Sequence, residues 1–255
     1  MTKLKNKLLI ILLTIASVLC CVIAGNAIPQ KTLKANASTE TPSLTIISNN
    51  LSYKDSIYMI YAVSYNGFDK TQNEIKMLFW EDIQQEYTLG TEKYTASNKG
   101  YATVKEQDCL IFYSDGIAAK EMTDDIYARA YVEIDGEVYY SDVMKNSVLE
   151  YVHTKREAGG LTEQQTATFD AMLEYGATVQ SLLGYNVDRL ANETYYRINV
   201  VNGTLADGFP YGLYKANDII TIQANEAEKG MQFSHWEDSA GESFGEEQTQ
   251  EITVS

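Results

Sequence analysis

The chain has two histidines, and they are its best candidates for acid–base or nucleophilic chemistry. A catalytic triad needs a nucleophile, a base and an orienting acid held together, usually within a recognisable local frame. His153 follows Val152 near the expected end of a helix, where an imidazole can interact with the last helical carbonyls. His235 lies between Ser234 and Trp236 and alternates with apolar residues, as on one face of a strand. Both are therefore predicted to be structural.

Other catalytic signals are weak. The sequence contains no G-x-S-x-G, H-E-x-x-H, P-loop or G-x-G-x-x-G motif. Cys109 begins the apolar run Cys-Leu-Ile-Phe-Tyr, which is typical of a buried strand, so its thiol is predicted to be inert. We expect a protein without enzymatic activity.

Acidic pairs occur at Asp124-Asp125 and Glu237-Asp238. Glycosidase chemistry needs two carboxyl groups that face each other across a cleft, whereas adjacent residues of a strand point to opposite sides. Weak calcium binding at an acidic loop is conceivable, yet no EF-hand spacing is present. We expect solvated turns at both pairs, with no bound metal and no cofactor.

Tyrosine is abundant, with 19 residues, and several tyrosines fall on the predicted outward faces of strands. Aromatic side chains offer rigid apolar area with a polar tip, which suits contact with a glycan or a protein. The candidates for such a surface are Tyr127, Tyr131, Tyr139 and Tyr140. Ordinary cross-strand packing explains them equally simply and is the favoured interpretation.

The N-terminus resembles a secretory signal. Lys3, Lys5 and Lys7 precede the uncharged apolar run 8–24, and Gly25-Asn26-Ala27 offers small residues for cleavage after Ala27. A signal peptide over 1–27 implies a secreted or cell-surface protein that contacts a membrane only through this segment. An uncleaved anchor is the alternative.

The chain is strongly acidic. Its formal net charge is −15, and cleavage after Ala27 would remove three lysines and no acid, giving −18. Such a chain is repelled by phosphate backbones, so nucleic acid is excluded as a partner. An unidentified protein or glycan ligand is expected instead.

Period-two alternation predicts a mainly β fold. After a polar linker over 28–42, strands are expected at 44–48, 56–65, 74–80, 101–105, 109–114, 126–134 and 137–140. Asp135-Gly136 predicts a hairpin between the last two. Short strands at this spacing favour an immunoglobulin- or fibronectin-like β-sandwich over 43–140.

A helical hairpin is expected over 141–192. Ser141 is the predicted N-cap of the first helix, which Gly159-Gly160 ends. Thr162-Glu163-Gln164-Gln165 is a capping box for the second helix, which Gly184 ends.

Alternation returns after Tyr195, with strands expected from 195, over 218–224 and 231–236, and from 251. This region, 193–255, resembles the internalin B-type repeat of bacterial surface proteins. The matching residues are Val201-Asn202-Gly203-Thr204, Gly212-Leu213-Tyr214, Asp218 to Ala224, Gly230 and Phe233 to Glu237. The resemblance implies a small β-grasp-like module with Phe233 and Trp236 as core anchors. Asn217 stands where the family usually has glycine, at a turn that requires a positive φ.

The closing strand of the repeat is expected to be missing, so the module is predicted to be truncated. The stretches Tyr127 to Val132, Ser147 to Tyr151 and Leu173 to Ala177 lie within residues 126–192, which resemble surface modules of gut Firmicutes. This resemblance implies location and no activity. Together these features predict a non-enzymatic adhesion, interaction or spacer protein at the cell surface. The alternative is the N-terminal accessory region of a larger secreted enzyme, for example one that degrades polysaccharides, whose catalytic domain is expected to be missing from this sequence.

Overall fold

The computed structural model describes residues 40–255, which form one compact unit. The predicted signal peptide over 1–27 and all but the last three residues of the predicted linker lie outside the described residues. Among residues 40–255, no helix has the length and apolar character needed to cross a membrane. This part of the chain is mainly β, with two α-helices and several antiparallel sheets.

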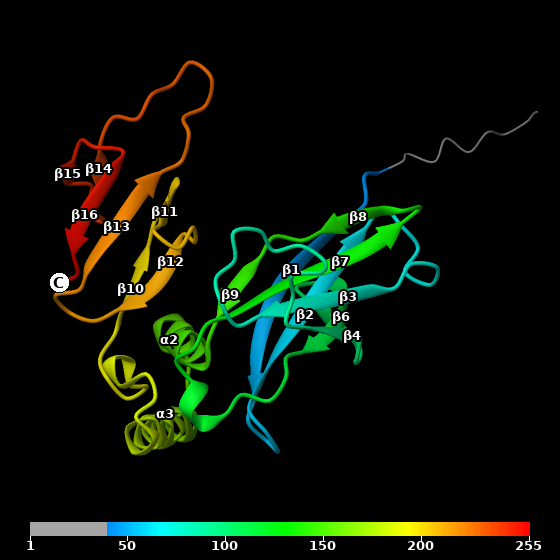
Figure 1. Ribbon diagram of the computed structural model, residues 1–255, viewed down its shortest axis with the longest axis horizontal. Helices are drawn as coiled ribbons and strands as arrows, with labels where there is room; N and C mark the ends of the chain where they lie inside the picture. The colour runs from blue at the N-terminus through cyan, green and yellow to red at the C-terminus, as the bar shows by residue number, and fades with distance from the viewer. Residues whose placement is uncertain (1–39) are drawn as a thin grey trace, which may run out of the picture. The chain divides into compact units, whose positions relative to one another are not determined.

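The first nine strands form two antiparallel sheets (Figure 1). One has the order β1-β2-β6-β5, from β1 (Ser43–Ser52), β2 (Tyr58–Asn66), β6 (Gln107–Tyr113) and β5 (Gly100–Val104). The other has the order β4-β3-β7-β8, from β4 (Tyr94–Ser97), β3 (Ile75–Trp80), β7 (Ile126–Ile134) and β8 (Glu137–Tyr140). The short β9 (Met144–Asn146) pairs with the start of β7.

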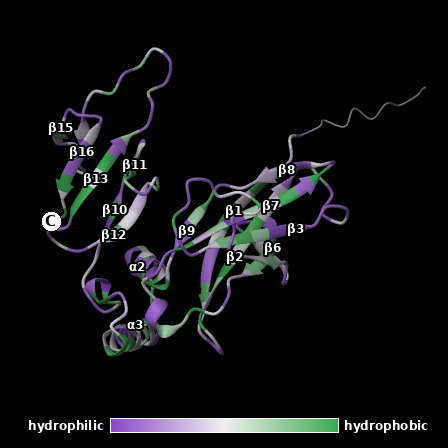
Figure 2. Cartoon of the chain, viewed as in Figure 1, coloured by the Kyte–Doolittle hydropathy of each residue, from purple (hydrophilic) through white to green (hydrophobic). Residues whose placement is uncertain are grey.

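Alternate residues of both sheets enter one core. Tyr61 and Val63 of β2 and Met77 and Phe79 of β3 are completely buried, and the rings of Tyr61 and Phe79 lie 5.6 Å apart. Figure 2 shows hydrophobic residues interspersed with hydrophilic ones along these strands. Apolar burial must stabilise this fold, because Cys109 is the one cysteine among residues 40–255 and cannot form an internal disulfide.

The hairpin between β7 and β8 has the predicted boundaries. Asp135 and Gly136 have φ values of 52° and 86°, the left-handed conformation of a type I′ turn. The register pairs Ile134 with Glu137 and Tyr131 with Tyr140. The prediction of antiparallel partners is confirmed.

The first helix begins later than predicted. Ser147, not Ser141, is the N-cap of α2 (Val148–Ala158), and its hydroxyl accepts a hydrogen bond from the Glu150 amide. The Ser141 hydroxyl accepts one from Ala130 at 3.0 Å, within the sheet. Met144, which lies within the range predicted to be helical, is in β9.

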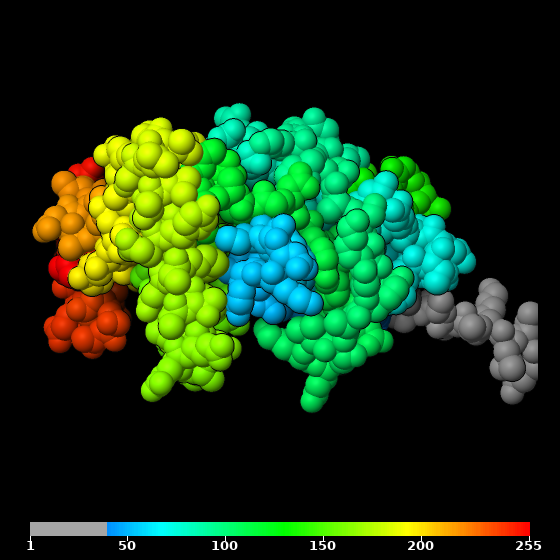
Figure 3. Space-filling view, turned by 90° about the horizontal axis from the view of Figure 1, so that it is seen from below, coloured from blue at the N-terminus to red at the C-terminus, as the bar shows by residue number. Residues whose placement is uncertain are grey.

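The second helix, α3 (Glu163–Leu183), has the predicted ends. Thr162 and Gln165 form the capping box, and Gly184 has the left-handed conformation. Helix α3 packs on a one-turn 3-10 helix, η1 (Ala119–Glu121), and on the turn between β1 and β2. There the ring of Phe169 lies 6.2 Å from that of Tyr53, and Figure 3 shows this turn in blue beside the yellow-green helical residues.

Seven short strands follow. β10 (Tyr196–Asn199) pairs with β12 (Tyr211–Tyr214), and β11 (Gly203–Leu205), β13 (Ile219–Ala224) and β16 (Thr249–Thr253) form a sheet with β13 in the middle. β14 (Trp236–Glu237) pairs with β15 (Ser243–Gly245). The predicted strand over 231–236 is wrong except at Trp236, since residues 231–235 pair with no strand among the described residues.

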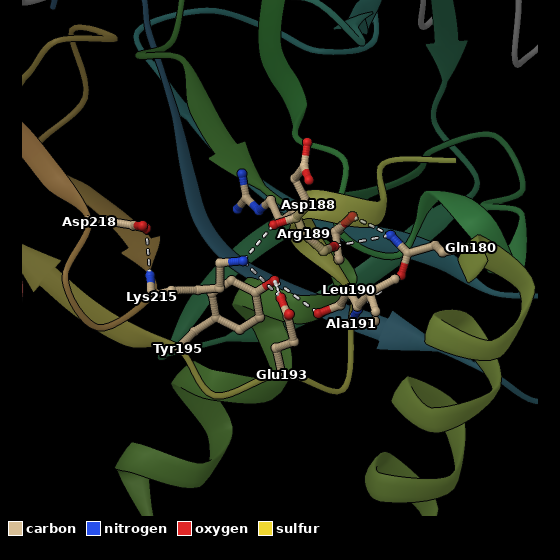
Figure 4. Close-up of polar contacts among 10 residues, drawn as sticks. Gln180, Asp188, Arg189, Leu190, Ala191, Glu193, Tyr195, Lys215 and Asp218 are labelled. Atoms are coloured by element: carbon tan, nitrogen blue, oxygen red, sulfur yellow. Dashed lines mark hydrogen bonds and ion pairs between the residues drawn. The ribbon is translucent and has the colours of Figure 1, made fainter. Parts of the chain in front are cut away.

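A buried glutamine fixes the segment between α3 and β10, which contains the 3-10 helix η2 (Val187–Arg189). The completely buried Gln180 accepts a hydrogen bond from the Ala191 amide at 2.9 Å and donates one to the Arg189 carbonyl at 3.1 Å. Figure 4 shows these contacts, together with the Lys215 ammonium 2.7 Å from the Asp188 carbonyl oxygen. The segment is therefore held to α3 on one side and to the C-terminal strands on the other.

Candidate functional site

The four candidate tyrosines do not form one surface. Tyr131 and Tyr140 are register partners on one face of their sheet, with ring centroids 6.4 Å apart. Tyr139 pairs with Val132 and packs on the core side. A platform built from all four is therefore incompatible with the register.

Tyr127 is buried, contrary to the expectation of an outward side chain. It lies on the same face as Tyr131, yet only 5% of it is exposed, because Tyr87 and Phe209 cover it. Tyr140 also has internal partners, since the Arg129 guanidinium lies 4.4 Å from its ring centroid. The packing interpretation fits these residues better than ligand contact.

His153 has a half-buried structural position on α2. Its ring lies edge-on to Tyr195 at 6.2 Å, and burial, together with the charge of Arg156, lowers its pKa. No nucleophile or acid is hydrogen-bonded to it among the described residues.

His235 lies just before β14 and is exposed, instead of alternating along a strand. Its Nδ1 is 2.8 Å from the Ser234 hydroxyl and its Nε2 is 2.8 Å from a Glu237 carboxylate oxygen. These residue types match a triad, but all three side chains are open to solvent on an exposed segment. Catalysis of that kind relies on a water-excluded site with preorganised donors, and this geometry supplies none.

The proposed anchors of the C-terminal region pack together. Trp236 is 8% exposed, and its ring lies 5.5 Å from that of the half-buried Phe233. A Cβ on Gly203 would lie 2.8 Å from the Trp236 ring, so glycine is needed for this close approach. Asn217 has a φ of 70°, the positive value expected at its turn.

Cys109 is 1% exposed on β6, and burial raises its pKa. This is the buried strand position predicted for it. A buried, protonated thiol is a poor nucleophile.

The structure reveals a site that the sequence did not predict, a cleft of about 570 Å³ beside the end of β3 and the start of β7. The segments after β6 and after α3 complete its wall. Seven carboxyl groups and one guanidinium line it: Glu81, Asp82, Asp115, Glu121, Asp124, Asp125, Asp207 and Arg189. Its size is that of a typical small-ligand site.

Lysines neutralise part of this charge. Lys93 pairs with Glu81, Lys120 with Glu121 and Lys145 with Asp207. The other four carboxyl groups form no ion pair with a lysine or arginine of residues 40–255: Asp82, Asp115, Asp124 and Asp125. The cleft therefore keeps a negative potential.

The pair Asp124-Asp125 is not the solvated turn expected. Asp124 accepts hydrogen bonds from the Tyr185 hydroxyl at 2.5 Å and the Asn186 amide at 3.1 Å, which fixes its carboxylate in the wall. Asp125 is half-buried, and burial raises its pKa, although the positive charges of Arg189 and Lys145 oppose this shift.

Two aromatic rings, those of Tyr94 and Tyr185, line the cleft and add a second kind of contact. Burial raises the pKa of Tyr94 to about 12, and the hydrogen bond to Asp124 raises that of Tyr185 to about 12, so both phenols are neutral at physiological pH. The Lys120 ammonium lies 4.1 Å from the Tyr185 ring centroid and 2.6 Å from Glu121. A carboxylate and a ring face thus already hold one ammonium at this edge of the cleft.

Arg189 is held by its backbone more than by its side chain. Its carbonyl accepts the Gln180 hydrogen bond (Figure 4), while its buried Nε has no hydrogen-bond partner among the described residues. Among residues 40–255, Arg189 is the one cationic residue in the lining of the cleft, so its guanidinium charge opposes an incoming cation.

No serine, cysteine, histidine or lysine is among the described residues that line the cleft. No group of three or more histidine, cysteine, aspartate or glutamate residues within 40–255 has a geometry that could hold a metal ion. Carboxylates and aromatic ring faces are both groups that attract an ammonium or a guanidinium.

Comparison with known proteins gives no identity for the chain. No protein-family model, no curated protein and no solved structure matches it.

Proposed function

We propose that this chain is an exported, non-enzymatic interaction module of the cell surface, and that its acidic cleft binds a cationic group of the ligand. The observation that carries the proposal is the combination of four carboxyl groups without lysine or arginine partners and the rings of Tyr94 and Tyr185 around one cleft. An ammonium or guanidinium of a partner protein would gain both charge pairing and cation–π contact there.

The proposed architecture supports a display role. Two antiparallel sheets with a common core are consistent with an immunoglobulin- or fibronectin-like sandwich over 43–140. The packing of Phe233 on Trp236 and the positive φ of Asn217 are consistent with an internalin B-type repeat over 193–255. Such modules present surfaces to partners.

Export is testable by itself. Expression with the native N-terminus should place the chain outside the cytoplasm, with a new N-terminus at Ile28. Retention in the cytoplasm with Met1 intact would reject this part of the proposal.

The cleft is tested with spermidine, a small polycation, by calorimetric titration of the secreted form. The variants Asp124→Asn and Asp82→Asn should each weaken binding about tenfold, because each removes one charged contact. Asp55→Asn, which removes an exposed carboxylate on the turn between β1 and β2, is the matched control and should leave the affinity unchanged. Equal losses in all three variants would mean non-specific attraction to an acidic protein.

The alternative function, an accessory region of a secreted polysaccharide-degrading enzyme, predicts a different ligand. Neutral oligosaccharides should then bind and should compete with spermidine. If a neutral oligosaccharide binds with saturation and Asp124→Asn abolishes this binding, the cleft is a sugar site and the cation proposal is wrong.

A further inference from the structure

A second concave surface lies on the C-terminal strands. This groove of about 1060 Å³ follows β10 and β13 and is closed on one side by the segment 225–235. Its floor includes the buried side chains of Val200, Ile222 and Trp236, which belong to the core of this region. It shares no lining residue with the acidic cleft.

The rim of the groove exposes large apolar side chains. Val201 is 80% exposed, Met231 70% and Phe244 46%, although each could bury its surface against an occupant of the groove. A single exposed apolar residue needs no explanation, but three that line one groove above an apolar floor form an apolar patch. Such patches on soluble proteins mark interaction sites.

The charge around the groove indicates the occupant. Its lining contains four acids and no lysine or arginine: Glu226, Glu228, Glu237 and Asp238. An apolar segment flanked by basic residues would match both the floor and the rim. A second copy of this chain matches poorly, because it would bring the same four acids and a net charge of −15.

We propose that this groove is a docking site for an apolar polypeptide segment that carries lysine or arginine at its ends. This proposal rests on the proposed function of the chain as an interaction module. It adds a second binding site, which is apolar with an acidic rim. The apolar floor provides affinity through burial, and the acidic rim selects basic partners and orients them.

The test uses the secreted form of the chain and a fluorescently labelled octapeptide with four apolar residues between two pairs of lysines. Fluorescence anisotropy measures the binding of the peptide. The peptide should bind with saturation, and the version with glutamate in place of lysine should bind at least about tenfold more weakly. Met231→Ser and Phe244→Ser should each weaken binding about tenfold, because each removes buried apolar area. Equal affinity for the two peptides would overturn the proposal.

Matched controls separate the groove from general stickiness. Leu182→Ser removes a side chain that is 80% exposed on α3, outside the groove, and should not change binding. Glu226→Gln should weaken binding, while Glu246→Gln, an exposed acid of the same region outside the lining, should not. Circular dichroism should give the same melting temperature for all five variants, because the altered side chains are exposed.

Three further results would contradict the proposal. The first is an equal loss of binding in Leu182→Ser. The second is that spermidine displaces the peptide from the parent protein but not from Asp124→Asn, which would mean that the peptide binds in the acidic cleft. The third is a concentration-dependent dimer in sedimentation that Met231→Ser dissociates, which would make the groove an interface between copies. A failure here leaves the cleft proposal intact, because the spermidine titration depends on other residues.

Discussion

The Lys145 ammonium lies 2.5 Å from a carboxylate oxygen of Asp207, and only 5% of Lys145 is exposed. Lys145 belongs to β9, whereas Asp207 follows β11, so this pair joins the first two sheets to the C-terminal strands. The Tyr211 hydroxyl donates to the Lys145 carbonyl at 2.7 Å beside it. The wall of the acidic cleft therefore depends on a contact between segments 62 residues apart.

Lys145→Met should destabilise the fold by about 2 kcal/mol, because it leaves the Asp207 carboxylate without its charge partner. The loss is below that of a fully buried pair, since the Asp207 side chain is 26% exposed. Urea unfolding measures it. Lys76→Met is the control, because the Lys76–Glu74 pair is exposed and its loss should cost less than about 0.5 kcal/mol. Equal effects would show that the Lys145 pair is not a structural connection.

Gln180→Leu should cost about 3 kcal/mol, since it leaves the Ala191 amide and the Arg189 carbonyl without partners. Hydrogen exchange at Ala191 should accelerate more than exchange in β7. Gln164→Leu, at an exposed position on α3, should change neither quantity. Unchanged exchange at Ala191 would contradict the assigned role of Gln180.

Tyr61→Phe should stabilise the protein by about 1 kcal/mol. The Tyr61 hydroxyl is fully buried and has no hydrogen-bond partner among the described residues, so its removal relieves a desolvation cost. Tyr94→Phe should have the opposite sign, because the Tyr94 hydroxyl accepts a hydrogen bond from the Asp115 amide at 3.0 Å. Thermal unfolding measures the stability of both variants. A loss of stability in Tyr61→Phe would mean that the Tyr61 hydroxyl makes a stabilising hydrogen bond, which would contradict this account.

The strands and helices with strong local signals could be predicted from the sequence. The Asp135-Gly136 turn correctly predicted the β7–β8 hairpin, and the capping box at Thr162 correctly predicted the start of α3. The predicted start of α2 was wrong because Ser141 and Ser147 are both serines that could cap a helix. Only the pairing with β7 shows that 144–146 is a strand. Strands as short as β4 and β9 lack enough residues to display a period.

The cleft could not be predicted, because its wall comes from segments far apart in the sequence. Asp82, Asp115, Asp124 and Asp207 become neighbours only in the folded chain, where the segments after β3, β6 and η1 meet the segment after β11. The acidic pair Asp124-Asp125 was the one local signal. Its partners Tyr185 and Asn186 lie about sixty residues away, so solvation was the natural expectation.

Spermidine binding should weaken as the pH falls. Burial raises the pKa of Asp125 above its usual value of 3.8. The negative charges of Asp207 and Asp124 raise it further, whereas the positive charges of Arg189 and Lys145 lower it. Protonation therefore removes its charge at a higher pH than for an ordinary aspartate, and cation affinity declines through that range. Titrations at several pH values should show this decline, and Asp125→Asn should flatten it. A slope that survives in Asp125→Asn would assign the effect to another group.

The same shift has an opposite consequence for stability. A carboxyl group whose pKa is raised in the folded state disfavours folding when it is ionised, so its contribution improves as the pH falls. Asp125→Asn should therefore be more stable than the parent at pH 7, with a difference that shrinks on acidification. Urea unfolding at several pH values measures this difference, and a constant difference would contradict the raised pKa.

The most direct measurement is an NMR titration of the isotope-labelled secreted form with spermidine. The account predicts the largest backbone shift changes at Asp124, Asp125 and Asn186, with saturation at one equivalent. Changes of similar size at Glu246 and Glu247, or changes spread over every acidic surface without saturation, would show that the cleft is not a binding site.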